Sequence, residues 1–295
     1  MPVSITEALE ANENAAVTKA TQAGAQLPRY LLLSALAGAF VGFAIVLLLM
    51  TSAPLVVAGH PMAKLVQGGV FGLALTLVVF AGAELFTGNN MVMIQGLWAR
   101  KVKVVDLALV WAASLFGNLV GSLAFAWLVK ASGIITTGAP VGGSTPFKTV
   151  LAGIATTKHN LTGSQLFFRA VLCNMLVCLA LWMATRASSD AAKLVVLWFA
   201  LLAFIASGFE HSIANMTSLG LAAFVGVGKW SDLVRNLTYT IPGNVVGGGL
   251  FIGLVYAYIG KPRATAVEPE TPVLAVAETN GSSATPKRRT KVAVG

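Results

Sequence analysis

The stretch Phe204-Ile-Ala-Ser-Gly-Phe-Glu-His-Ser-Ile-Ala-Asn-Met216 carries polar side chains inside otherwise apolar sequence. They are Glu210, His211, Ser212 and Asn215. Ionisable groups at membrane depth are costly, so they usually face the interior of a helical bundle or a water-filled path. Ser207 and Glu210 also have capping-box spacing, which signals a helix start where a helix should run through. The stretch therefore predicts one membrane span broken in the middle, with His211 in the first turn of its second half.

The composition of the 295-residue chain is typical of a membrane protein. Hydrophobic residues make up 56% of it and charged residues 11%, whereas a soluble domain carries about 25% charged residues. Six stretches are long and apolar enough to approach the roughly 17–25 residues that cross a bilayer as a helix. They are 31–50, 65–83, 107–129, 170–185, 194–209 with its continuation 211–228, and 237–260. The sequence predicts an all-α membrane protein with six transmembrane helices.

Polar segments flank these spans, so the predicted transmembrane domain covers residues 29–260. Residues 1–28 contain Glu7, Glu10 and Glu13 and are too polar for a secretory signal. Within them, Ile5, Leu9 and Val17 can share one face of an amphipathic helix, and a frayed polar lead-in is the alternative. Residues 261–295 are rich in Ala, Thr, Val, Pro, Glu and Ser, a composition that predicts a disordered cytoplasmic tail.

The loop charges predict the orientation of the spans. With both termini cytoplasmic, the cytoplasmic flanks hold Arg29, Arg100, Lys101, Lys103, Arg186, Lys193, Lys261 and Arg263. The opposite flanks hold only Lys64, Lys130, Lys229 and Arg235 near span ends. Because Lys and Arg accumulate on the cytoplasmic side, we expect a multi-pass protein of the inner (plasma) membrane with both termini in the cytoplasm. Nothing in the net charge of +9 indicates a nucleic-acid partner.

Two motifs recur at one spacing, which indicates an internal repeat. Gly-x-Glu-x-x-x-x-Asn begins at Gly82 and again at Gly208, and Gly-Asn-x-x-Gly begins at Gly117 and again at Gly243, 126 residues later in both cases. Each half then holds three spans, and three crossings reverse the chain, so the halves are expected to be inverted. Inverted repeats with interrupted spans mark a substrate path at the middle of the membrane. Helix N-termini that meet there favour an anion.

The repeated polar side chains are predicted to be structural at the two breaks, which interrupt the second and fifth spans. They are Glu84, Asn89, Glu210 and Asn215. The glutamates are expected to accept hydrogen bonds from the backbone freed at the breaks, and Asn118 and Asn244 to bond between helices. No cofactor and no metal are predicted. In particular, Glu210 and His211 are neighbours that point about 100° apart on a helix, so they cannot converge on one metal ion.

Four segments resemble the formate/nitrite transporter family, over about residues 29–260. They are Ala83-Glu-Leu-Phe-Thr-Gly88, Asn174-Met-Leu-Val-Cys-Leu-Ala-Leu-Trp-Met183, the stretch quoted first, and Gly243-Asn244. The resemblance is closest to the nitrite branch. It implies an aquaporin-like pore in each protomer of a homopentamer, and transport of small monovalent anions (formate, nitrite or hydrosulfide), sometimes with a proton. We expect the protomers to pack through small residues, namely Gly117, Gly121, Gly247 and Gly248.

The resemblance also implies roles for individual residues. His211 is similar to the central pore histidine of the family, and Asn174 to its amide partner. Thr87 matches the threonine of the loop that interrupts the second span, and Lys158 the lysine of the outer funnel. The residues at the outer apolar constriction are Phe71, Val177 and Phe204, and those at the inner one are Leu75, Leu85 and Phe86.

The predicted function is a channel or transporter for nitrite and/or formate, and not an enzyme. A bare charge is costly between apolar side chains, so His211 is expected to protonate the weak-acid anion and let a neutral acid pass. Three alternatives remain open. They are a hydrosulfide channel of the same family, a neutral-solute pore for water or ammonia, and a membrane enzyme that uses Glu210 and His211. The Asn-Pro-Ala repeats of aquaporins are absent from the sequence.

Overall fold

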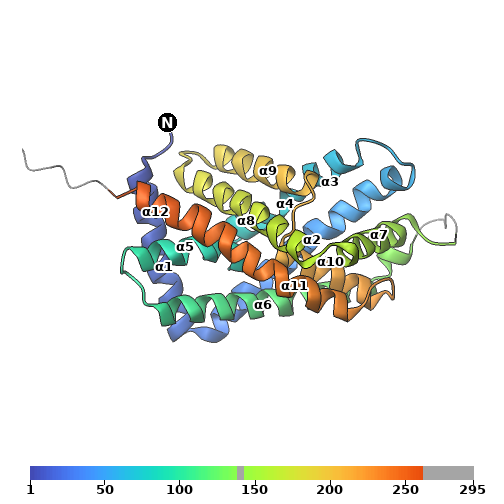
Figure 1. The fold of residues 1–295 in the computed structure, drawn as a ribbon, viewed down its shortest axis with the longest axis horizontal. Coiled ribbons are helices and arrows are strands. Elements are labelled where there is room, and N and C mark those ends of the chain that lie inside the picture. Colours follow the sequence, from blue (N-terminus) through green and yellow to red (C-terminus); the bar gives the residue numbers. More distant parts are fainter. Residues whose placement is uncertain (138–142, 262–295) are drawn as a thin grey trace, which may run out of the picture. The chain divides into compact units, whose positions relative to one another are not determined.

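The computed structural model describes residues 1–137 and 143–261, and its regular elements are all helices. The predicted all-α class is therefore confirmed, while the predicted tail lies outside the described residues apart from Lys261 (Figure 1). The helices are α1 (Ile5–Ala25), α2 (Leu27–Val57), α3 (Ala63–Phe71), α4 (Leu73–Phe80), α5 (Phe86–Trp98), α6 (Val104–Ala131), η1 (Ile134–Thr136), α7 (Pro146–Asn160), α8 (Gly163–Arg186), α9 (Asp190–Ala206), α10 (Ser212–Phe224), α11 (Trp230–Val245), the π-helix η2 (Val246–Leu254) and α12 (Val255–Ile259).

Five helical segments are long and apolar enough to cross a membrane. They are Leu27–Val57, Ala63–Phe80, Val104–Ala131, Gly163–Arg186 and Trp230–Ile259. The predicted fifth span is not among these segments because the chain divides it into α9 and α10. The predicted second span is divided in the same way, since α4 ends at Phe80 and α5 begins at Phe86. Both breaks lie in the segments where the sequence predicts them.

Each break contains a glycine in the left-handed region of the backbone. Gly82 has φ 74° and Gly208 has φ 72°, a conformation that glycine adopts without the steric cost of a side chain. The predicted capping box at Ser207 is wrong. Ser207 instead follows the last residue of α9, and the N-cap of α10 is His211. The helix therefore starts later than the motif suggests, because the left-handed Gly208 separates the serine from it.

The closest helix packing pairs α2 with α6 in the first half and α8 with α11 and η2 in the second. Glycines permit both approaches, since a β-carbon at Gly121 would overlap the carbonyl oxygen of Ala35, and one at Gly247 would overlap that of Val171. Gly117 and Gly248 likewise lie against side chains of α2 and α8. The prediction that these four glycines pack protomers together is therefore wrong, because they pack helices within one protomer.

The N-terminal segment forms α1, which packs against α5, α6 and α8. Ser4 caps the helix by accepting a hydrogen bond from the Glu7 amide. Leu9 belongs to the buried face, whereas Val17 is 39% exposed and lies outside it. The buried face is therefore made mostly of alanines, and it brings Lys19 close to the first break.

Candidate functional site

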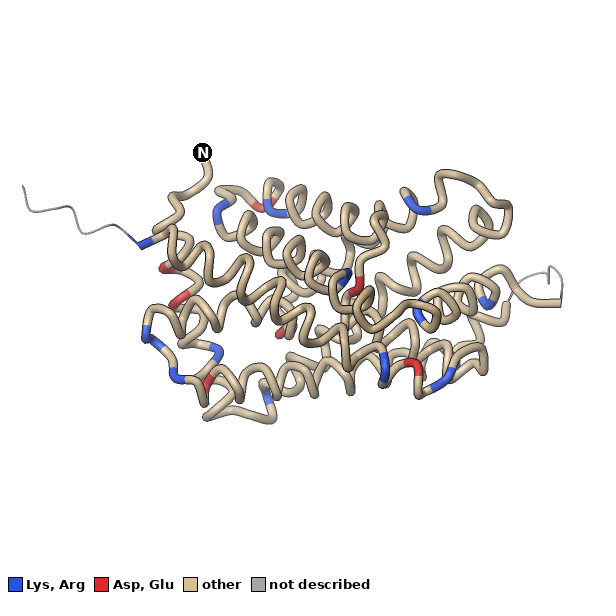
Figure 2. Tube along the Cα trace, in the orientation of Figure 1, with Lys and Arg blue, Asp and Glu red and all other residues tan. Residues whose placement is uncertain are grey.

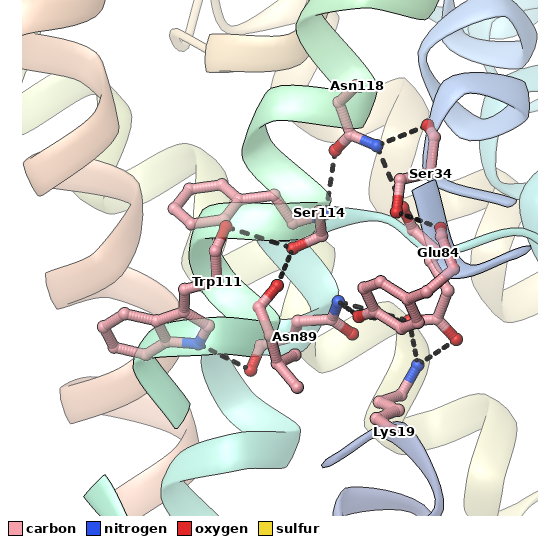
Figure 3. A network of polar contacts seen from close by, with 10 residues as sticks. Lys19, Ser34, Glu84, Asn89, Trp111, Ser114 and Asn118 are labelled. Atoms are coloured by element: carbon pink, nitrogen blue, oxygen red, sulfur yellow. Dashed lines mark hydrogen bonds and ion pairs between the residues drawn. The ribbon is translucent and has the colours of Figure 1, made fainter. Parts of the chain in front are cut away.

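The first break is held by the side-chain amide of Asn118, which lies on α6. Its Oδ1 accepts a hydrogen bond from the Phe86 amide at 2.9 Å. Its Nδ2 donates to the carbonyl oxygens of Ser34 at 2.7 Å and Glu84 at 2.9 Å (Figure 3). One amide therefore satisfies two backbone groups of the interrupted segment and fixes them to α2. An amide suits this task because it offers both a donor and an acceptor.

The second break has the same construction, 126 residues later in the sequence. Asn244 accepts a hydrogen bond from the Ser212 amide at 2.9 Å. It donates to the carbonyl oxygens of Ala170 at 2.8 Å and Glu210 at 3.1 Å. The expectation that both asparagines bond between helices is confirmed. We call Asn118 and Asn244 the asparagine clamps.

The carboxylate at the first break is bound by a lysine from α1. Lys19 Nζ lies 2.7 and 2.6 Å from the two oxygens of Glu84. Tyr30 Oη donates to the same carboxylate at 3.1 Å and Asn89 Nδ2 at 3.2 Å (Figure 3). No repeated motif marks Lys19 in the sequence, because the residue 126 positions after it is Thr145, which is not a lysine. Only the packing of α1 brings it to the break.

The carboxylate at the second break is bound in an equivalent way. Lys158 Nζ, on α7, lies 2.7 and 2.8 Å from the two oxygens of Glu210. Asn215 Nδ2 donates to that carboxylate at 2.7 Å and Asn236 Nδ2 at 3.2 Å. The expectation that the glutamates accept from freed backbone is therefore wrong. The neutral asparagine clamps satisfy the backbone, while the buried carboxylates take cationic partners, which a buried charge requires.

His211 and Thr87 bring the two breaks together. His211 Nδ1 accepts a hydrogen bond from the Ala214 amide at 3.1 Å and so caps α10. In a neutral imidazole one ring nitrogen accepts and the other donates, so this cap assigns the proton to Nε2. Nε2 lies 3.0 Å from Thr87 Oγ1 on α5. Both side chains are buried, and the Phe204 ring stacks on the imidazole with 5.9 Å between centroids.

The side chains around His211 enclose a cavity of about 10 Å³, which has room for about one water molecule. Its wall consists of Val41, Phe71, Ala74, Leu75, Leu85, Val177, Leu201, Phe204 and His211. Five of the six residues that the resemblance places at constrictions are in this wall. The sixth, Phe86, packs against Trp111 with ring centroids 6.4 Å apart. The cavity is therefore too small for an anion with three heavy atoms, such as nitrite or formate.

A larger hollow of about 510 Å³ lies on the side of the first break. Its lining includes Lys19, Glu84 and Lys193. Leu85 lines both this hollow and the small cavity at His211, so its side chain separates the two. By the 126-residue spacing, Leu85 is the counterpart of His211 in the repeat.

Asn174 does not hydrogen-bond His211 within the described chain, which corrects the partner that the resemblance implies. Its Nδ2 lies 3.1 Å from the Thr87 carbonyl, 3.0 Å from Asn90 Oδ1 and 2.7 Å from the Asn244 carbonyl. Both ring nitrogens of His211 are already engaged, by Ala214 and by Thr87. Asn174 therefore links α5 to α11 beside the first clamped segment.

Arg169 is a cation at the second break that the sequence analysis missed. Its Nη1 donates to the Gly208 carbonyl at 3.3 Å, and its own carbonyl accepts from the Glu210 amide at 3.2 Å. Across residues 1–137 and 143–261 no carboxylate lies within ion-pair distance of its guanidinium. Arg169, rather than the neutralised Lys158, carries the uncompensated positive charge beside this break.

This fold and site define a membrane transport protein. The chain belongs to the formate/nitrite transporter family, because residues 6–258 match the model described as "Formate/nitrite transporter". It is 41% identical over 235 residues to the nitrite transporter NirC of Escherichia coli (strain K12), an alignment that covers 78% of this chain and 83% of that one. It is 40% identical over 245 residues to a probable formate transporter of Methanothermobacter thermautotrophicus, with 79% and 89% covered.

Solved structures agree with this assignment. A chain described as an FNT family ion channel superposes with a TM-score of 0.79 at 36% identity, covering 87% of this chain and 100% of that one. A pentameric formate channel with formate bound superposes with a TM-score of 0.66 at 30% identity, covering 79% and 97%. The family resemblance of the sequence is therefore confirmed.

The pairing of Lys158 with Glu210 predicts a stability effect that a free funnel lysine would not have. Lys158→Met leaves a buried carboxylate without its cation, a change that costs about 3–5 kcal/mol. The melting temperature of the purified protein in detergent is expected to be clearly lower for this variant. The double variant Lys158→Met/Glu210→Gln is expected to recover part of the loss. Equal melting temperatures for parent and Lys158→Met would show that the ion pair contributes nothing.

Proposed function

We propose that this protein is a membrane channel or transporter for small monovalent anions, nitrite and/or formate. The observation that carries the proposal is the junction of the two interrupted segments, where His211 Nε2 and Thr87 Oγ1 lie 3.0 Å apart in an apolar enclosure. Polar donors with apolar surroundings can select an anion while excluding bulk water. Relatives described as nitrite and formate transporters support this substrate class.

The proposed assembly is a homopentamer of six-span protomers in the inner (plasma) membrane, with both termini cytoplasmic. The similar solved structure described as a pentameric formate channel supports the stoichiometry. The equivalent clamps of Asn118 and Asn244 support an inverted three-plus-three repeat, because each holds a break at the same place in its half. The excess of Lys and Arg on one set of loops supports the orientation.

The proposed mechanism begins with attraction of the anion to the side of the second break. Lys158 is engaged by Glu210, so we assign the larger share of this attraction to Arg169, whose guanidinium has no carboxylate partner in the described chain. Nitrite and formate are planar and present two oxygens, which match the planar donor fork of a guanidinium. The anion then reaches His211 once the side chains around the small cavity move apart.

The proposed role of His211 follows from its two hydrogen bonds. In the neutral ring, Nε2–H points toward Thr87 and can donate to an anion that replaces the hydroxyl. A protonated ring has N–H groups at both nitrogens, so it would lose the cap to Ala214. The charged ring is therefore expected only while an anion lies beside it and stabilises it. The second ring proton is taken up from water at Nδ1, and transfer of the Nε2 proton to the anion then removes both charges. The neutral acid crosses the apolar side chains, and the ring moves its remaining proton from Nδ1 back to Nε2 before the cap to Ala214 forms again.

Leu85 is the proposed barrier on the other side of the histidine. It separates the small cavity from the 510 Å³ hollow, so its displacement would connect His211 to that hollow. Lys19 and Glu84 line the hollow as an ion pair, which leaves little net charge to hold the released anion.

We propose no enzymatic activity. A hydrosulfide channel and a neutral-solute pore for water or ammonia are the competing functions.

The His211→Asn variant tests the function and the proton step together. Asparagine retains a hydrogen-bonding side chain but cannot exchange a proton. We expect the parent to carry nitrite or formate with a proton flux that rises from about pH 7.5 to pH 5, the range in which histidine titrates. The variant is expected to fold, to admit the anion, and to lose most of this pH dependence. The measurement is anion flux and proton flux in the same proteoliposomes.

The same assay separates the competing functions. Osmotic swelling without nitrite or formate flux would indicate a neutral-solute pore, and hydrosulfide flux alone would indicate the hydrosulfide channel. If His211→Asn retains the pH profile and the proton flux of the parent, then the histidine is a packing residue and the proton step is wrong.

Arg169 gives a prediction specific to the entry of the anion. Arg169→Gln is expected to lower nitrite uptake several-fold at low substrate concentration, and the difference should shrink at high ionic strength, where salt screens the charge. Arg169→Lys keeps the charge but not the donor fork, so it should lose preference for nitrite over chloride. Lys130→Gln, at the exposed end of α6, removes the same charge elsewhere. If nitrite uptake is equal in Arg169→Gln and Lys130→Gln, the role of Arg169 is refuted.

A further inference from the structure

A second hollow of about 750 Å³ lies between α5 and η2, and it shares no lining residue with the cavity at His211. Most of its wall is apolar, including Ile94, Leu97, Leu250 and Leu254. On the side of α11 and η2 the wall runs from Val245 to Leu254. We call this hollow the α5–η2 groove.

One end of the groove is cationic and aromatic. Trp98, Arg100 and Lys261 line it there, and Lys261 Nζ lies 5.7 Å from the centroid of the Trp98 ring. Figure 2 shows further Lys and Arg residues at the end of the bundle where α5 and α12 lie. Tryptophan and cationic side chains are typical of the boundary between the hydrocarbon and the lipid headgroups. The groove therefore has the polarity of a phospholipid, with an apolar length and a charged end.

The two cations have no anionic partner within the part of the chain that the structure describes. Lys101, next in sequence to Arg100, pairs with Glu13 at 3.0 Å. Arg100 and Lys261 form no ion pair with any described carboxylate, and both are exposed. Their charges are therefore available to a phosphate.

The backbone of Arg100 is strained at this end of the groove. Its φ is 59°, and among the described residues no other non-glycine residue has a positive φ. The position follows the end of α5, where the Lys101 amide donates to the Gly96 carbonyl at 3.0 Å. Glycine is the usual residue at this point of a helix end, because a β-carbon is disfavoured in the left-handed region. The arginine at this position is therefore held at a cost in backbone strain, which a glycine would relieve.

We propose that the α5–η2 groove binds an anionic phospholipid. The phosphate lies between Arg100 and Lys261, and an acyl chain runs along Ile94, Leu250 and Leu254. Basic pockets between transmembrane helices recognise such headgroups. Two uncompensated cations favour a lipid with net negative charge over a zwitterionic lipid of the same chain length.

The test uses the purified full-length protein, delipidated in detergent, and native mass spectrometry. Dioleoyl-phosphatidylglycerol is expected to remain bound, at least fivefold more than dioleoyl-phosphatidylcholine. Arg100→Gly/Lys261→Gln is expected to lose this excess, whereas Lys64→Gln/Lys130→Gln, with the same loss of charge elsewhere, is expected to retain it. Arg100→Gly alone should also raise the melting temperature of the delipidated protein, because glycine relieves the backbone strain. If Arg100 served only the fold, its replacement would not both remove the excess of phosphatidylglycerol and raise the melting temperature.

Leu250→Trp fills the groove without changing its charge, and it is expected to displace the phosphatidylglycerol. Equal retention of the two lipids would overturn the proposal, as would a charge variant that binds phosphatidylglycerol like the parent. If Leu250→Trp instead dissociates the oligomer and leaves lipid binding unchanged, the groove is an interface between copies of this chain. A variant truncated after Lys261 checks one more occupant. If only this variant binds phosphatidylglycerol, the residues after Lys261 occupy the groove in the full-length protein, and the proposal is overturned.

Discussion

The structure depends on one constraint, which is that backbone groups freed inside a membrane must find partners within the protein. Two spans are interrupted, and in each half a single asparagine side chain satisfies two backbone groups of the interrupted segment and one of a neighbouring helix. Asn118 and Asn244 perform this task with closely similar distances. Because the interrupted segments cannot move freely, Leu85 and His211, which are equivalent in the repeat, are both held in the wall of the small cavity.

The amides bind the freed backbone and the carboxylates bind lysines, and this difference sets the net charge beside the two breaks. Glu84 and Glu210 are buried beside the breaks, and Lys19 and Lys158 neutralise them. An anion that approaches therefore meets little repulsion from the carboxylates. In the proposed mechanism, the polar groups left for the anion are Arg169 beside the second break and the His211–Thr87 pair. The apolar wall around that pair separates it from water, which strengthens each remaining hydrogen bond.

Much of this arrangement could be predicted from local sequence. The position of both breaks follows from Gly82 and Gly208, and the helix contacts of Asn118 and Asn244 from the motif that they share. Other features depend on tertiary packing and carry no local signal. Lys19 reaches the first break only because α1 packs across the bundle, and Arg169 faces the second break only because α8 passes beside it. The amide of Asn174 binds Thr87 instead of His211 because the ring nitrogens already have partners.

We propose that the clamped breaks hold His211 and Thr87 together at the point where the anion passes. Nitrite flux through Asn244→Ala in proteoliposomes tests it most directly, since this change frees the Ser212 amide and two carbonyl groups without touching the histidine. We expect the variant to assemble with the size of the parent oligomer but to lose at least about tenfold in flux, equivalent to about 1.4 kcal/mol. Flux equal to that of the parent, in protein shown to contain the substitution, would contradict it.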